Sequence, residues 1–151
     1  MKYRLLLLCL LMFSFAMLKA QGKGYGIGII IGEPTGISGK MWLSKTNAID
    51  AGLAWSFVKP GSIHLHGDYL WHTSAVVDSS HKIPLYFGIG GRLKFGDKET
   101  GRVGVRITGG VDFMLESAPI DIFIELAPIM DLVPATELAI NGGIGARFFF
   151  Q

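Results

Sequence analysis

The chain has 151 residues, 50% of them hydrophobic, with 14 Lys and Arg residues, 12 Asp and Glu residues and a formal net charge of +2. Lys2, Arg4 and Lys19 lie in the first 20 residues, so 11 basic and 12 acidic residues remain in residues 21–151, without a basic run that could follow a nucleic-acid backbone. Cys9, the one cysteine, lies in the same segment, which excludes disulfides and a thiol nucleophile from the rest of the chain.

The first 20 residues have the pattern of a secretory signal peptide. Lys2 and Arg4 precede an apolar run over residues 5–18, and Ala20 provides a cleavage point. The apolar run is shorter than the ~20 residues that a membrane-spanning helix needs. We therefore expect residues 1–20 to be removed on export and residues 21–151 to form one domain.

Alternating apolar and polar residues predict eight β-strands in residues 21–151, separated by turn residues such as Pro34, Pro60, Asp97 and Pro134. The expected strands are 22–31, 36–43, 48–57, 62–72, 84–95, 102–115, 120–127 and 137–150. Most of them have the ~9 to 11 residues that a tilted membrane strand needs. All 21 glycines follow residue 20 and are spread through these runs, which indicates tight curvature or close backbone approach in a sheet.

One face of the expected strands carries no charge. Its members are Tyr25, Ile27, Ile29, Ile31, Ile49, Ala51, Leu53, Trp55, Phe57, Ile63, Leu65, Gly67, Tyr69, Trp71, Leu85, Phe87, Ile89, Leu93, Phe95, Val103, Val105, Ile107, Val111, Phe113, Ile120, Ile122, Ile124, Leu126, Leu138, Ile140, Ile144, Phe148 and Phe150. A basic side chain at the lipid midplane costs ~2 to 4 kcal/mol, so a bilayer favours such a face. We predict an all-β fold, an eight-stranded antiparallel transmembrane β-barrel with up-and-down connections.

A soluble lipocalin-like barrel is the alternative fold, since it would turn the apolar face inward. Two features favour the membrane barrel. The charged face is rich in small residues, which suits the crowded interior of a narrow barrel. Aromatic residues lie near strand ends, as in the girdles of membrane barrels: Tyr25, Trp55, Phe57, Trp71, Phe95 and Phe113.

The final strand carries a family resemblance. Its sequence, NGGIGARFFF over residues 141–150, resembles the terminal strand of Gram-negative outer-membrane proteins, although Gln151 follows the last aromatic residue. The segments GIG at 26–28, PLYFGIGGR at 84–92 and DLVP at 131–134 resemble a subfamily of short OmpA/OmpX-like barrels, mostly of unknown function. The resemblance implies a cell outer membrane location, outer-membrane lipids as partners, and Gly145, Phe148 and Phe150 as the signal read by the barrel-insertion machinery.

The opposite face holds five cations and five anions, which we expect to neutralise one another inside the barrel. They are Lys40, Asp50, Asp68, Arg92, Lys94, Arg106, Asp112, Asp121, Glu125 and Arg147. The sequence therefore predicts a monomer with a structural or surface-interaction role and no cofactor. A small pore for ions or solutes is the alternative function, and glycine-lined gaps would favour it.

One group of residues has side chains that commonly bind metal ions. His64, His66 and Asp68 share the inward face of one expected strand, with His72 further along it. Interior polar packing is the preferred account, with a metal site as the alternative. A catalytic role for Ser38, Ser56 or Ser62 beside His64 has no supporting spacing, so no enzyme activity is predicted.

An even number of strands places both chain ends on the periplasmic side, so the turns near Glu33, Pro60, Asp97 and Asp131 are expected to face outward. These turns are short, which limits the recognition surface for an extracellular ligand. The sequence identifies no such ligand.

Overall fold

The structure is a computed structural model and describes residues 24–56, 61–73, 83–96, 99–115 and 117–150. The predicted signal peptide, residues 1–20, and Phe57 lie outside the described residues. Eight strands are present: β1 (Tyr25–Glu33), β2 (Thr35–Trp42), β3 (Asn47–Trp55), β4 (Ser62–His72), β5 (Leu85–Gly96), β6 (Glu99–Met114), β7 (Ile120–Val133) and β8 (Glu137–Phe150). None of the described residues forms a helix long and apolar enough to cross a membrane.

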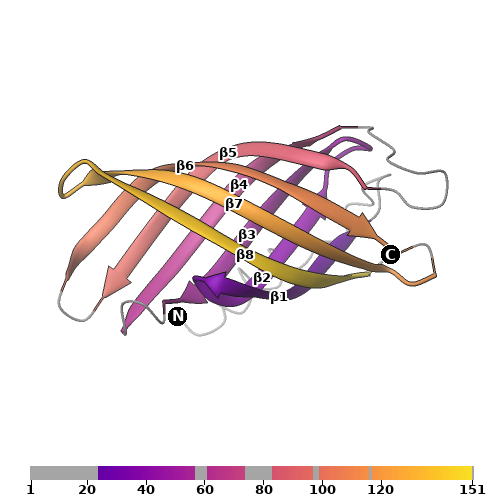
Figure 1. Ribbon diagram of the computed structural model, residues 1–151, viewed down its shortest axis with the longest axis horizontal. Coiled ribbons are helices and arrows are strands. Elements are labelled where there is room, and N and C mark those ends of the chain that lie inside the picture. The colour runs from indigo at the N-terminus through magenta and orange to yellow at the C-terminus, as the bar shows by residue number, and fades with distance from the viewer. Residues whose placement is uncertain (1–23, 57–60, 74–82, 97–98, 116, 151) are drawn as a thin grey trace, which may run out of the picture.

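The strands form a closed barrel in sequence order, every neighbouring pair being antiparallel (Figure 1). The β1–β8 pair closes it, with Tyr25 opposite Phe150 and Glu33 opposite Gly142. Closure leaves no unpaired sheet edge. This confirms the predicted fold class of an eight-stranded up-and-down barrel. We call the end with the β1–β2, β3–β4, β5–β6 and β7–β8 connections the Pro34 end, and the opposite end the Trp42 end.

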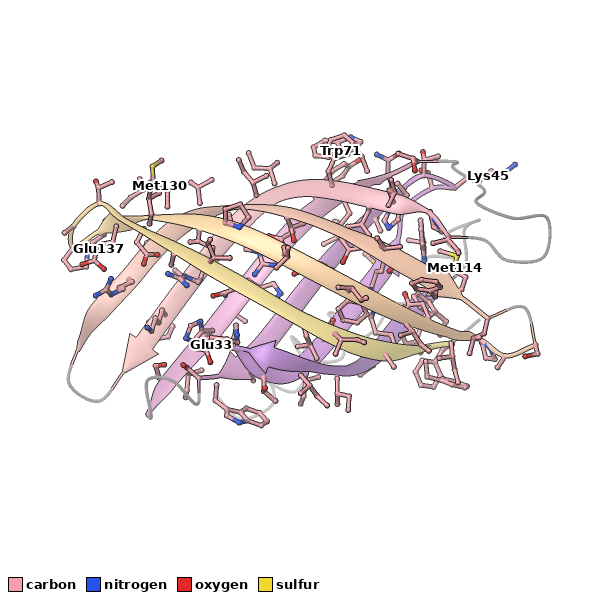
Figure 2. The ribbon with its side chains drawn as sticks, viewed as in Figure 1. Glu33, Lys45, Trp71, Met114, Met130 and Glu137 are labelled. Carbon is pink, nitrogen blue, oxygen red and sulfur yellow. The ribbon has the colours of Figure 1, made fainter. Side chains whose placement is uncertain are left out.

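Strand alternation separates the two faces as predicted. Ile107, Phe87 and Ile31 are 58–60% exposed on the outside, whereas Arg106 is 1% exposed on the inside. Figure 2 shows Trp71 and Met130 projecting outward from the wall. Of the expected outer face, Val111 and Ile120 are half-buried, and the other described members are exposed.

Outward aromatic residues gather toward the two ends of the wall. Near the Trp42 end, the Trp71 and Phe87 rings stack with centroids 5.4 Å apart, and the Tyr25 and Phe150 rings stack at 5.3 Å. Near the Pro34 end, Ile63 is the cross-strand partner of both Trp55 and Phe95. Together they make two aromatic zones separated by aliphatic residues.

One predicted boundary is wrong. The sequence predicts that the seventh strand ends at Ala127 and that Asp131 lies in an outward turn, but β7 continues to Val133 and Asp131 is 1% exposed inside the barrel. The alternation continues through Pro128, which lies on the exposed face, and the β6–β7 ladder is interrupted there, its partners passing from Arg106↔Ile129 to Gly109↔Leu126. A proline without an N–H is tolerated where the ladder is interrupted.

The interior at the Trp42 end is apolar. Trp42, Ala48, Leu70 and Tyr86 form a buried cluster, against which Met114 and Phe149 pack. The remaining length of the interior is occupied mainly by charged side chains, and these define the candidate site.

Candidate functional site: the charged interior

The inward charges expected from the sequence all lie inside the barrel. Their exposed fractions run from 0% for Asp112 to 9% for Lys94. All of them except Lys94 fall into three groups along the barrel, and β6 contributes one charged side chain to each group: Asp112, Arg106 and Arg102.

The Asp112 cluster, nearest the Trp42 end, consists of Lys40, His72, Asp112, Asp121 and Arg147. Lys40 Nζ donates to Asp112 Oδ2 and lies 2.8 Å from His72 Nε2. Arg147 Nη2 is 3.3 Å from Asp112 Oδ1, and its Nε donates to Asp121 Oδ1 at 3.1 Å. Two cations thus meet two carboxylates, and the cluster is balanced when His72 is neutral.

Aromatic rings enclose the cations of the Asp112 cluster. The Arg147 guanidinium lies 3.8 Å from the centroid of the Phe123 ring, and Lys40 Nζ lies 4.7 Å from that of Trp42. Such contacts stabilise desolvated cations by roughly 0.5 to 2 kcal/mol each. They hold the cluster against the apolar end of the interior.

The Asp131 cluster, nearest the Pro34 end, consists of Arg92, Arg102, Asp131 and Glu137. Arg92 Nη2 donates to both carboxylate oxygens of Asp131, at 2.6 and 2.5 Å. Arg102 Nη1 lies 3.7 Å from Asp131 Oδ2 and donates to Glu137 Oε2. Asp131 and Arg102 are not among the interior charges predicted from the sequence. The two-residue spacing Glu125, Ala127, Ile129, Asp131 was the signal that could have found the first of them.

The central cluster lies between these two and consists of Asp50, His66, Asp68, Arg106 and Glu125. Arg106 Nε is 2.7 Å from Asp68 Oδ2, and Arg106 Nη2 donates to Glu125 Oε1 at 2.5 Å. Tyr86 Oη donates to Glu125 Oε2 at 3.0 Å. The cluster therefore holds one guanidinium and three carboxylates, and the guanidinium contacts those of Asp68 and Glu125.

The residues that come together as candidate metal ligands differ from the predicted set. His64, His66 and Asp68 do share the inward face of β4, but the ligand atoms that come together, within 4.8 Å of one another, belong to Asp50, His66 and Asp68. Asp50 joins them from β3 because it is the cross-strand partner of Asp68. His64 instead has its Nε2 3.3 Å from Ser62 Oγ.

The serines form no complete nucleophilic triad within the described part of the chain. The Ser62–His64 distance is longer than a normal nucleophile–base hydrogen bond, and His64 Nδ1 has no hydrogen-bond partner among the described residues to orient the ring. Ser56 Oγ donates to Glu33 Oε1, and Ser38 is buried in β2.

The residues of the expected insertion signal lie on β8. Phe148 and Phe150 are outward, 46% and 43% exposed, with ring centroids 5.1 Å apart. Gly145 faces inward, and a Cβ there would lie 2.4 Å from Cζ of Phe123. The glycine thus has a packing role in the barrel that does not depend on recognition.

Comparisons with protein-family models, with curated proteins and with solved structures find no match for this chain.

Proposed function

We propose that the chain is an integral outer-membrane β-barrel protein of the small OmpA/OmpX-like kind, a monomer with a structural or surface-interaction role. The observation that carries the proposal is the wall itself, an apolar outer face around an ionic interior. Exposed Ile, Leu, Val and aromatic side chains occupy the outside of every strand. A soluble monomer rarely exposes a contiguous apolar patch larger than a few hundred Å². Lipid chains are the surroundings in which this face is stable.

The arrangement of the outward aromatic residues supports the same proposal. Trp71, Phe87, Tyr25 and Phe150 lie toward the Trp42 end, and Trp55 lies toward the other. Aromatic side chains at two levels are typical of barrels that contact both membrane interfaces. By the resemblance of residues 141–150, the barrel-insertion machinery is the assembly partner, and residues 1–20 are the export signal.

A closed interior favours the structural role over the pore. Water in a continuous channel would contact the side chains that line it, yet Arg106 and Arg147 are each 1% exposed. Eight strands enclose a space that side chains can fill. We therefore propose a barrel whose ionic interior holds the wall together, without a catalytic activity.

Tryptophan fluorescence in vesicles tests the membrane proposal. The chain has three tryptophans, so replacing two of them at a time by Phe makes three single-tryptophan proteins. Trp55 and Trp71 are 47% and 37% exposed on the outer face, whereas Trp42 is 2% exposed inside. In vesicles of lipids with brominated acyl chains, Trp55 and Trp71 should be strongly quenched.

Trp42 is the matched internal control and should keep most of its emission. Equal emission of all three proteins in brominated and plain vesicles would contradict the proposal. A protein that stays dispersed and folded in buffer without detergent would also contradict the proposal.

A further inference from the structure

We propose that the central cluster binds one divalent first-row transition ion through Asp50, His66 and Asp68. One ligand atom of each residue lies within 4.8 Å of the other two. Metal–nitrogen and metal–oxygen bonds of ~2.0 to 2.2 Å place two donors of one ion at most ~4.4 Å apart, so shifts of a few tenths of an ångström bring the three atoms onto a shared ion. The proposal concerns the interior only and goes beyond the proposed membrane role.

The charge balance of the central cluster calls for a further cation. Arg106 is engaged with Asp68 Oδ2 at 2.7 Å and with Glu125 Oε1 at 2.5 Å. Lys40 is the cross-strand partner of Asp50, but its Nζ contacts Asp112 and His72 instead. A carboxylate taken out of water stays ionised only beside a partner charge or a metal, and is otherwise protonated. A bound divalent ion supplies the charge that the neighbouring side chains do not.

Asp50 has a carboxylate oxygen available to bind a metal ion. The residue is 3% exposed, and within the described part of the chain its Oδ1 has no hydrogen-bond partner. The same holds for Asp68 Oδ1 and for His66 Nδ1. Because Arg106 occupies the Oδ2 side of Asp68, the other oxygen remains available to a metal.

Two glycines fit the ligand side chains closely. A Cβ at Gly52 would lie 2.3 Å from Cε1 of His66, and a Cβ at Gly90 would lie 2.0 Å from Asp68 Oδ1. The backbone at these glycines therefore provides the space that the two ligands occupy. Gly52 is the β3 partner of His66, and Gly90 is the β5 partner of Asp68.

The donor set selects the class of ion. Two carboxylate oxygens and one imidazole nitrogen suit Mn²⁺, Co²⁺ and Zn²⁺, whereas Ca²⁺ and Mg²⁺ prefer oxygen donors alone. Three protein ligands leave further positions for water.

The test uses tag-free protein refolded in detergent with one equivalent of Co²⁺, followed by desalting. We expect about one Co²⁺ per chain, visible absorption from its d–d transitions, and an unfolding midpoint several degrees above that of the metal-free protein. Zn²⁺ should displace Co²⁺ and remove the absorption, and Mg²⁺ at the same concentration should not. Protein that retains no Co²⁺ and shows no shift in midpoint would overturn the proposal.

The variants Asp50→Asn and His66→Gln test whether these residues bind the ion. His64→Gln is the matched control on the same strand face. The first two should lower Co²⁺ affinity at least tenfold, and the control should bind as the parent does. Asp50→Asn should also leave the metal-free barrel no less stable, since it removes an uncompensated charge. Equal loss in His64→Gln and His66→Gln, or a wild-type barrel that is stabilised by acid alone and binds no ion, would overturn the assignment.

Discussion

Gly90 and Asp68 are cross-strand partners, and a Cβ at residue 90 would lie 2.0 Å from Asp68 Oδ1. The same relation recurs inside the barrel: a Cβ at Gly110 would lie 2.4 Å from Tyr86 Oη, and one at Gly104 would lie 2.5 Å from Asp131 Oδ1. Large inward side chains therefore lean over glycines of the neighbouring strand. This pairing lets eight strands enclose so many charged and aromatic groups.

Gly90→Ala should destabilise the barrel by about 1 to 3 kcal/mol, because the added methyl would lie 2.1 Å from the Gly67 carbonyl oxygen of β4 and would displace the Asp68 side chain from its ion pair with Arg106. Gly91→Ala is the matched control, since a Cβ at this outward position meets nothing nearer than 3.8 Å. Urea unfolding in detergent, followed by tryptophan emission, measures both. Equal unfolding midpoints for the two variants would contradict the packing argument.

Asp112→Asn should destabilise the barrel more than Asp121→Asn. Asp112 contacts Lys40, His72 and Arg147, whereas Asp121 contacts Arg147, which keeps Asp112 when Asp121 is lost. Stranding buried cations costs about 3 to 5 kcal/mol, so Asp112→Asn should approach this range and Asp121→Asn should stay well below it. Unfolding free energies measured in the same detergent decide the order.

Arg92→Met should cost about 3 kcal/mol, because Asp131 loses its two-oxygen contact and keeps only Arg102 at 3.7 Å. Lys45→Met, at an exposed turn position, is the control and should change stability little. Adding Asp131→Asn to Arg92→Met should recover part of the loss. A loss of stability in the double variant equal to or larger than the sum of the two single losses would contradict the pairing.

The refolded barrel should be electrically silent in a planar bilayer. Arg106 on β6 contacts Glu125 on the neighbouring β7 at 2.5 Å and Asp68 on β4 at 2.7 Å, so the double change Arg106→Ala and Glu125→Ala should open a path and produce conductance steps. Insertion of each protein is verified by brominated-lipid quenching of Trp55. Stable conductance steps from the unchanged protein would instead indicate that it functions as a small pore.

Phe150→Ala should reduce the amount of barrel assembled in the outer membrane of cells while leaving refolding in detergent intact. The reason is the resemblance of residues 141–150 to a terminal insertion signal. Ile144→Ala, at an outward position of the same strand that is 52% exposed, is the control. Equal assembly of the two variants would contradict a recognition role for Phe150.

Much of the architecture followed from periodicity alone. Alternation from Tyr25 onward predicted eight strands and their facing, because a strand offers its side chains only two directions and one of them must be apolar throughout. The predicted end of the seventh strand at Ala127 is wrong, since the alternation continues through Pro128 to Asp131. The inward position of the charges was predictable in the same way.

The sequence by itself determined which side chains face inward, since residue parity along a strand decides the face. Only the tertiary structure decided which of them meet. Lys40 opposes Asp50 across β2 and β3 but pairs with Asp112, 72 positions along the chain. Asp50 thereby stays beside Asp68 and His66 in the central cluster, while His64 is left out of it. The physical reason is that a long side chain in a narrow barrel reaches across the interior, and its partner depends on register, closure and the space left by neighbouring glycines.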